Sequence, residues 1–239
     1  MISIGLVVYG NSAKWQQQIA GLKKDLQVTQ LLVANNDHQN CRPEEIKGDN
    51  SSFEFSAYAQ LGSLLEGDGP FVIVNDTLFK THWQQGWTRL LQKAIARMDR
   101  RELVVWGDIR TDGDDIPERP ALFLASWIFV LPNRQSLEAF VQILSELCAA
   151  KMQEPSSAYA HFLQWWTSPS RRLFGWHGLR TAENLQRKIR SIRLEHALSA
   201  ALHQKNIPIH SLGHFSPLAY KFLRLFDRLR TRLDSLKSL

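Results

Sequence analysis

Cysteine is scarce in this chain, with only Cys41 and Cys148 among 239 residues. The two lie far apart and lack the close spacing of metal-binding pairs, so the sequence predicts no disulfide framework and fits a reducing compartment. Long apolar runs are also missing, and we expect no transmembrane helix because no stretch of about 18 apolar residues occurs. The apolar start at residues 2–8 lacks the basic flank and long hydrophobic core of a signal peptide, and we interpret it as a first strand.

Several catalytic motifs are missing as well. We find no G-x-S-x-G, no phosphate-binding G-x-x-x-x-G-K-[ST] and no G-x-G-x-x-G, which argues against a hydrolase, a P-loop enzyme and a dinucleotide-dependent dehydrogenase. The histidines do not show a zinc-binding spacing. The nearest pair, His210 and His214, lacks the glutamate of a zinc protease helix. Internal repeats and low-complexity linkers are absent too.

Acidic residues are few in the last third of the chain. Residues 171–239 hold 14 of the 29 Lys and Arg but only 4 of the 23 Asp and Glu, a balance of +10. The remaining 15 basic and 19 acidic residues give residues 1–170 a balance of −4, and the two sum to the net +6. This asymmetry predicts an anionic ligand or surface at the C-terminal end.

Apolar runs and helical spacings alternate along the first two thirds of the chain, which is typical of βαβ units and a parallel sheet. The hydrophobic fraction of 44% is sufficient for a large core. We therefore predict an α/β fold with a mostly parallel, Rossmann-like central sheet flanked by helices. The strands are expected at residues 2–8, 28–34, 71–74, 103–106, 121–131 and 206–212; the helices at 14–26, 53–65, 83–98, 137–152 and 185–204.

Polar residues follow three of the expected strands. They are Tyr9-Gly10-Asn11, Asn35-Asn36-Asp37 and Asn75-Asp76-Thr77. Ligands of open parallel sheets bind at the carboxyl ends of the strands, so these groups are candidates for a nucleotide or sugar site. Asn, Asp and Gly are also ordinary turn formers, which leaves a purely structural interpretation open at each strand end.

Four stretches of the sequence resemble bacterial glycosyltransferases of the rhamnan-synthesis kind. The stretches are DNSSFEFSAY at residues 49–58, VIVNDTLF at 72–79, Trp106-Gly107, and SWIFVL at 126–131. Their order and spacing agree with that family over roughly residues 1–150. The resemblance implies a GT-A type fold, here residues 1–212, a nucleotide-sugar donor, and transfer of the sugar onto a growing, lipid-linked surface glycan.

The resemblance also implies roles for individual residues. Such folds usually carry D-x-D after the central strand to hold Mg²⁺ or Mn²⁺ and the diphosphate, whereas this chain has Asn75-Asp76-Thr77 with one carboxylate. Asp76 is the candidate for catalysis and for the divalent cation, and Asn75 for the phosphates. Tyr9, Asn11, Asn35 and Asp37 are candidates for the nucleotide. Asp108, Asp112 and Glu195 are candidates for the general base that activates the acceptor hydroxyl.

Three acidic positions have simpler explanations. Asp112 fits a solvated loop. Glu195 can pair with a helical neighbour on a solvated face, and we favour this interpretation over a catalytic role. Glu54 stands at an expected helix start, where a carboxylate complements the helix dipole, and we favour this stabilising role over a contact with the donor.

The last segment, residues 213–239, is predicted to be a basic amphipathic helix. It has Phe222 and Phe226 within a leucine-rich stripe, and Arg and Lys between the apolar positions. This pattern is typical of helices that lie on an anionic membrane, although docking on the protein itself or on a partner also fits. We expect a cytoplasmic protein, peripheral at the inner face of the cell membrane, and no nucleic-acid partner.

Two alternatives to an active enzyme stay open. A degenerate transferase fold would hold a glycan or nucleotide without turnover, and the single carboxylate at Asp76 favours it. An interaction protein would use its basic tail to join a membrane complex.

Overall fold

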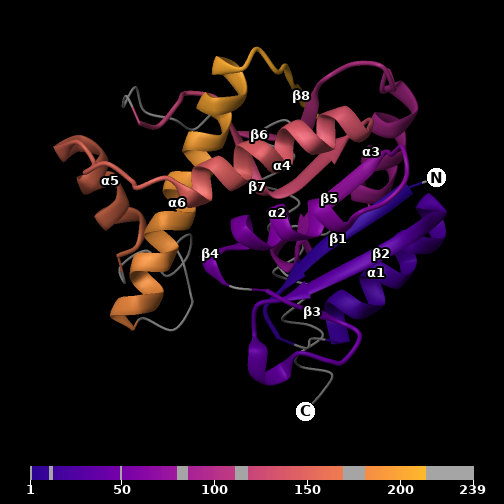
Figure 1. The fold of residues 1–239 in the computed structure, drawn as a ribbon, viewed down its shortest axis with the longest axis horizontal. Helices are drawn as coiled ribbons and strands as arrows, with labels where there is room; N and C mark the ends of the chain where they lie inside the picture. The colour runs from indigo at the N-terminus through magenta and orange to yellow at the C-terminus, as the bar shows by residue number, and fades with distance from the viewer. Residues whose placement is uncertain are drawn as a thin grey trace.

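The computed structural model describes residues 2–10, 13–48, 50–79, 86–110, 118–168 and 181–213. A seven-stranded mixed sheet forms its centre (Figure 1). In spatial order the strands are β3 (Ile46–Lys47), β2 (Val28–Asn35), β1 (Ile2–Val8), β5 (Phe71–Asn75), β7 (Phe123–Leu131), β6 (Val105–Arg110) and β8 (Ile209–Ser211). All neighbours are parallel except β7, which is antiparallel to both β5 and β6. The predicted α/β class and mostly parallel sheet are confirmed.

Helices cover both faces of this sheet. They are α1 (Ala13–Leu26), α2 (Glu54–Leu64), α3 (Gly86–Arg97), α4 (Arg134–Ala149) and α6 (Ala182–Gln204). A further helix, α5 (Ser157–Trp166), packs on α6 in a separate cluster. One core cluster joins the sheet to α1 and α3, and a second joins it to α2, α4 and α6. The alternation along β1 explains how one strand serves both clusters, since Leu6 and Val8 face α1 and α3 whereas Val7 faces α2.

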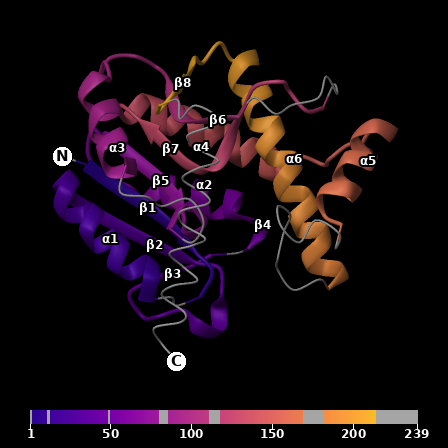
Figure 2. The same ribbon diagram turned by 180° about the vertical axis from the view of Figure 1, so that it is seen from behind.

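Three short elements and one helix were not predicted. They are the 3₁₀ turn η1 (His38–Asn40), the strands β3 and β4 (Ser51–Phe53), and α5. The polar, turn-rich sequence of residues 38–52 predicts a loop, because elements of two or three residues leave no periodicity to detect. Figures 1 and 2 both show α5 and the first half of α6 standing to one side of the sheet, beyond β4.

The chain changes direction within the sheet at β1. It proceeds from β1 outward to β2 and β3, and then returns to place β5 on the other side of β1. The neighbouring carboxyl ends of β1 and β5 therefore form a topological switch point, where open α/β sheets bind ligands.

The described residues contain no helix long and apolar enough to cross a bilayer. The predicted C-terminal helix lies almost wholly outside them, because the description ends at Gly213. That residue packs closely on α3, where an added Cβ would meet Leu90 Cδ2 at 2.8 Å.

Candidate active site at the switch point

The carboxyl ends of β1 and β5 are tied together directly. The backbone N–H of Tyr9 donates a hydrogen bond to Asp76 Oδ2 at 2.9 Å, and Asp76 is only 2% exposed. The neighbouring Asn75 is buried too, and its Oδ1 accepts from the N–H of Thr77 at 3.1 Å, which forms an Asx turn. The ends of these two strands thus lie together, as predicted. The side chains of Asp76 and Asn75 both accept hydrogen bonds from backbone N–H groups.

The end of β2 lies beside the end of β1. Asn35 is fully buried, and its Oδ1 accepts from Gly10 N and Asp37 N, while its Nδ2 donates to the Glu45 carboxylate at 2.8 Å. Its amide is therefore engaged by the protein itself. Asp37 is half-buried, and its Oδ2 lies 3.3 Å from the place of a Cβ on Gly10, whose φ is +82°. Of the two predicted nucleotide residues at the end of β2, Asp37 is the more exposed.

The junction between β4 and α2 brings an aromatic ring to the same place. Phe53 has φ 52° and ψ −125°, a conformation that side-chain-bearing residues rarely adopt. Its ring centroid is 5.8 Å from that of Tyr9. Because strained backbone of this kind costs about 1–3 kcal/mol and is concentrated at functional sites, Phe53 marks this junction as a candidate binding surface.

The carboxylate of Glu54, the first residue of α2, turns inward. It is 5% exposed, and its Oε1 accepts hydrogen bonds from Ser126 Oγ at 3.0 Å and Ser191 Oγ at 3.3 Å. A location in the first turn does complement the helix dipole, as expected. The interaction with the helix dipole does not explain why the Glu54 side chain is buried, nor why it contacts β7 and α6.

Ser126 of β7 connects several parts of the site. In the register of β7 against β6, Gly107 pairs with Phe129 but Ile109 pairs with Leu124. Ser126 lies between these two positions of β7 and is therefore outside the regular pairing with β6. The N–H of Ser126 donates to Glu195 Oε1 at 2.6 Å, and its carbonyl accepts from the hydroxyl of Tyr58. Sheet irregularities of this kind often lie next to active sites, where they redirect polar groups.

One face of α6 completes the site. Lys188, Ser191 and Glu195 follow each other at steps of three and four and so share a face of the helix. Ser191 contacts Glu54, Glu195 contacts Ser126, and Lys188 Nζ lies 6.0 Å from the ring centroid of Phe53. We call this face the α6 stripe. Its polar spacing is visible in the sequence, but the sequence does not tell which face of α6 the sheet covers.

The electrostatics of the site are dominated by acids. Burial raises the pKa of Glu195, and the charge of Glu54 adds to the rise, whereas Lys188 and the bond from Ser126 oppose it. Burial and then Glu54 also raise the pKa of Tyr9 well above its ordinary value. In the described part of the chain neither Glu54 nor Glu195 has a salt bridge, so two carboxyls converge on Ser126 with no cation within ion-pair distance. A raised pKa makes this carboxylate a stronger base than an ordinary one.

Asp108 is not brought to this site. Its Oδ2 accepts from Arg110 Nε at 2.8 Å, and the Arg110 guanidinium lies 5.0 Å from the ring of Trp127. Trp127 belongs to the core cluster under α1 and α3, on the opposite face of the sheet from α6. Of the three candidate bases, the structure therefore places Glu195 at the switch point and Asp108 elsewhere. Asn11 and Asp112 lie outside the described residues.

The predicted divalent cation has no matching set of ligands among the residues that are described. No group of three or more His, Cys, Asp or Glu side chains is arranged to hold a metal ion there. Asp76, the predicted ligand, is buried, and one of its carboxylate oxygens accepts a hydrogen bond from the N–H of Tyr9. The structure thus shows Asp76 in a contact with the backbone at the end of β1, and the divalent cation stays a prediction.

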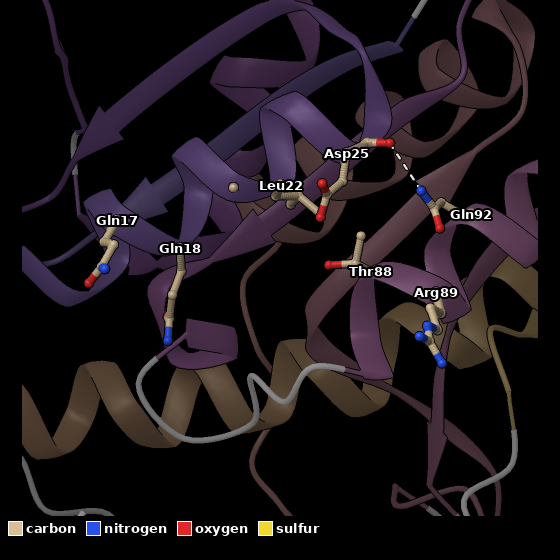
Figure 3. A pocket seen from close by; sticks show the side chains of 8 residues that line it. Gln17, Gln18, Leu22, Asp25, Thr88, Arg89 and Gln92 are labelled. Atoms are coloured by element: carbon tan, nitrogen blue, oxygen red, sulfur yellow. Dashed lines mark hydrogen bonds between the residues drawn. The ribbon is translucent and has the colours of Figure 1, made fainter. Parts of the chain in front are cut away.

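A groove of about 460 Å³ lies between α1 and α3 (Figure 3). Polar side chains line it, including Gln18, Asp25 and Arg89, and Gln92 donates to the carbonyl of Asp25. It runs between two helices on the outer surface and shares no lining residue with the switch point.

In comparisons with known proteins, no family model, no curated protein and no solved structure matched this chain.

Proposed function

We propose that this chain is a GT-A type glycosyltransferase that binds a nucleotide-sugar at the switch point and transfers the sugar to a surface glycan. One observation carries the proposal. Three of the four stretches that resemble the rhamnan-synthesis family lie together: Glu54 contacts Ser126, and Asp76 contacts Tyr9, whose ring lies beside Phe53. They are far apart in sequence, and a common ligand site would account for their convergence.

The geometry supports a position for the nucleoside. Asp37 and the glycine backbone at Gly10 stand at the carboxyl end of β1, where an acidic residue after the second strand can accept hydrogen bonds from ribose hydroxyls. The ring of Phe53, held near Tyr9, offers a face for stacking of the base. Gly10 has no Cβ, so the ligand can approach the backbone closely.

The carboxyl pair supports a chemical step. Glu195 takes the proton of the acceptor hydroxyl while that oxygen forms a bond to the anomeric carbon of the sugar. The bond from this carbon to the diphosphate breaks, and the nucleoside diphosphate leaves with the electron pair. The N–H of Ser126 holds Glu195 in place, and Glu54 in turn accepts a hydrogen bond from the hydroxyl of Ser126.

A binding module without turnover is the second candidate. The observation in its favour is the buried Asp76, which lacks the accessible oxygens of a cation site. Such a protein would bind the same ligands at the same edge of the sheet. The two candidates therefore differ in whether product is formed, and not in their affinity for the donor.

Thermal unfolding with a panel of UDP-, GDP-, CMP- and dTDP-sugars tests the proposal. A ligand at about 100 times its Kd stabilises the folded state by about 2.7 kcal/mol, which raises the Tm of a chain of this size by about 5 to 10 °C. We expect this shift for one nucleotide class, a loss of most of it in Asp37→Asn, and no loss in Asp68→Asn on an exposed loop.

No shift with any donor would contradict the proposed function. Where a donor binds, release of the free nucleoside diphosphate in the presence of glycan acceptors separates the two candidates. Turnover that is lost in Glu195→Gln with binding retained supports the enzyme. Binding without turnover for any acceptor supports the binding module.

The membrane remains part of the proposal. A lipid-linked acceptor would place the enzyme at an anionic membrane surface, and the basic, apolar pattern of residues 213–239 is the feature that supports this location.

A further inference from the structure

A nucleoside diphosphate brings negative charge that the protein must compensate when it binds and when it leaves. The described residues hold no group of three or more His, Cys, Asp or Glu side chains that could bind a cation for this purpose. Basic side chains near the switch point are another source of positive charge. The helix that covers this edge, α6, carries four basic residues: Arg187, Lys188, Arg190 and Arg193.

Three of these four side chains are engaged with the protein. Arg187 forms an ion pair with Glu183, one turn earlier. Arg190 and Arg193 donate to the backbone carbonyls of Cys148 and Gln153, away from the sheet edge. Within the described part of the chain, Lys188 makes no ion pair and no hydrogen bond.

The position of Lys188 suits a ligand at the end of β1. Its Nζ lies 6.0 Å from the ring of Phe53, which in turn lies 5.8 Å from the ring of Tyr9. Tyr9 continues from β1 and is bonded to Asp76 at the end of β5. The ammonium group therefore lies near the Phe53 and Tyr9 pair of rings, and Lys188 is half-buried on the face of α6 that contacts the site.

We infer that Lys188 binds the diphosphate of the donor and that this binding requires no divalent cation, an inference that rests on the proposed function. The ammonium group is a compact charge on a flexible stem, which suits the phosphate oxygens of a bound ligand. Lys188 thus takes the place that the resemblance assigned to a cation at Asp76.

The arrangement of charges along the α6 stripe explains how an acid-rich site can accept a diphosphate. Lys188 and Glu195 are seven residues apart, which is about 10 Å along a helix. The cation lies at the Phe53 end of the stripe, and the carboxyls of Glu54 and Glu195 meet at Ser126. The diphosphate lies at the Phe53 end of the stripe. The sugar and acceptor hydroxyls lie at the Ser126 end, where the carboxylates accept their hydrogen bonds.

The experiment measures binding of UDP, GDP and dTDP, and of the matching nucleosides without phosphate, by titration calorimetry in EDTA and in Mn²⁺. We expect one diphosphate to bind with the same affinity in both buffers. In Lys188→Gln its affinity should fall at least tenfold, with little change for the nucleoside. Lys188→Arg, which keeps the charge, should retain most of the affinity. Lys205→Gln, a substitution at a surface ion pair at the other end of α6, should have no effect.

Two results would overturn the inference and leave the proposed function standing: diphosphate binding that appears only with Mn²⁺, or unchanged diphosphate affinity in Lys188→Gln. Absence of binding by every nucleotide in both buffers would remove the proposed function together with the inference. The Tm of each variant without ligand reports folding. Lys188→Met, which keeps the stem that packs near Phe53, replaces the Gln variant if that one is unstable.

Discussion

Ser126 connects two acids that are 141 positions apart in sequence, since Glu54 bonds to its hydroxyl and Glu195 to its N–H. Each acid has an ordinary explanation when it is considered alone, a dipole contact for Glu54 and a helical pair for Glu195. The sequence could not reveal that they share a neighbour, because that depends on the shift of register between β6 and β7. The local roles were predictable and their convergence was not.

The raised pKa of Glu195 makes the stability of the protein depend on pH. The folded state holds this proton to a higher pH than the unfolded chain, so the contribution of Glu195 to the free energy of unfolding falls as pH rises between the two pKa values. In Glu195→Gln this loss disappears. We expect the variant to gain stability relative to wild type as pH increases through that interval, by about 1.4 kcal/mol for each unit of pKa elevation.

Urea denaturation at closely spaced pH values measures this difference. Glu146→Gln is the control, because that carboxylate is paired with Lys205 at the surface and its pKa is lowered, so its replacement should not produce a gain at higher pH. A stability difference between Glu195→Gln and wild type that stays constant with pH would contradict the assignment.

At the scale of elements, the long strands and helices were predictable because their apolar spacing is continuous. β1 and β2 begin at the predicted residues, and α4 begins three residues earlier than predicted because Asn133 accepts from Ser136 N as its N-cap. Strand direction was harder to obtain. β7 is an apolar run like the others, and nothing in such a run distinguishes an antiparallel strand from a parallel one.

The packing of α2 on α4 depends on Gly62. A Cβ there would lie 2.3 Å from Val141 Cγ2, closer than any real contact. We expect Gly62→Ala to destabilise the protein by about 1–3 kcal/mol through overpacking. In contrast, Gly21 on α1 has no atom within 4 Å of such a Cβ, and Gly21→Ala should stabilise by about 0.5–1 kcal/mol through its helix propensity.

Thermal unfolding of the two alanine variants measures both effects. Combining Gly62→Ala with Val141→Ala removes the clashing methyl groups and should restore part of the lost stability. Equal effects of the two glycine substitutions would show that α2 and α4 are not in close contact.

At the scale of the whole molecule, the acidic body and the basic end of the chain divide the surface charge unequally. Composition predicted this division, and the order of elements predicted the sheet and the edge at which we place the candidate site. The placement of α6 over that edge was not predictable. The sequence of residues 155–180, which precedes α6 and includes α5, shows no clear alternation of strands and helices. The prediction for residues 213–239 stays a prediction, since residues 214–239 lie outside the described ones.

Vesicle co-sedimentation tests the membrane location. We expect binding to vesicles with anionic lipid, weak binding to purely zwitterionic vesicles, and a reduction in binding by high salt. Replacing Phe222 and Phe226 together by Ser should reduce binding at least tenfold by removal of two buried rings. Full binding by this double variant would contradict a membrane role for the apolar stripe.

The site described here is assembled from both early and late parts of the chain. Tyr9, Glu54 and Asp76 leave the ribosome early, and Glu195 follows 119 residues after Asp76. At about 5–20 residues per second this delay is about 6 to 24 s, long enough for β1, β2 and β5 to pair first. During that time the strained turn at Phe53 and the inward carboxylate of Glu54 lack their partners on α6. The nascent protein therefore has most of its sheet well before the candidate site is complete, and α6 is the element that completes it.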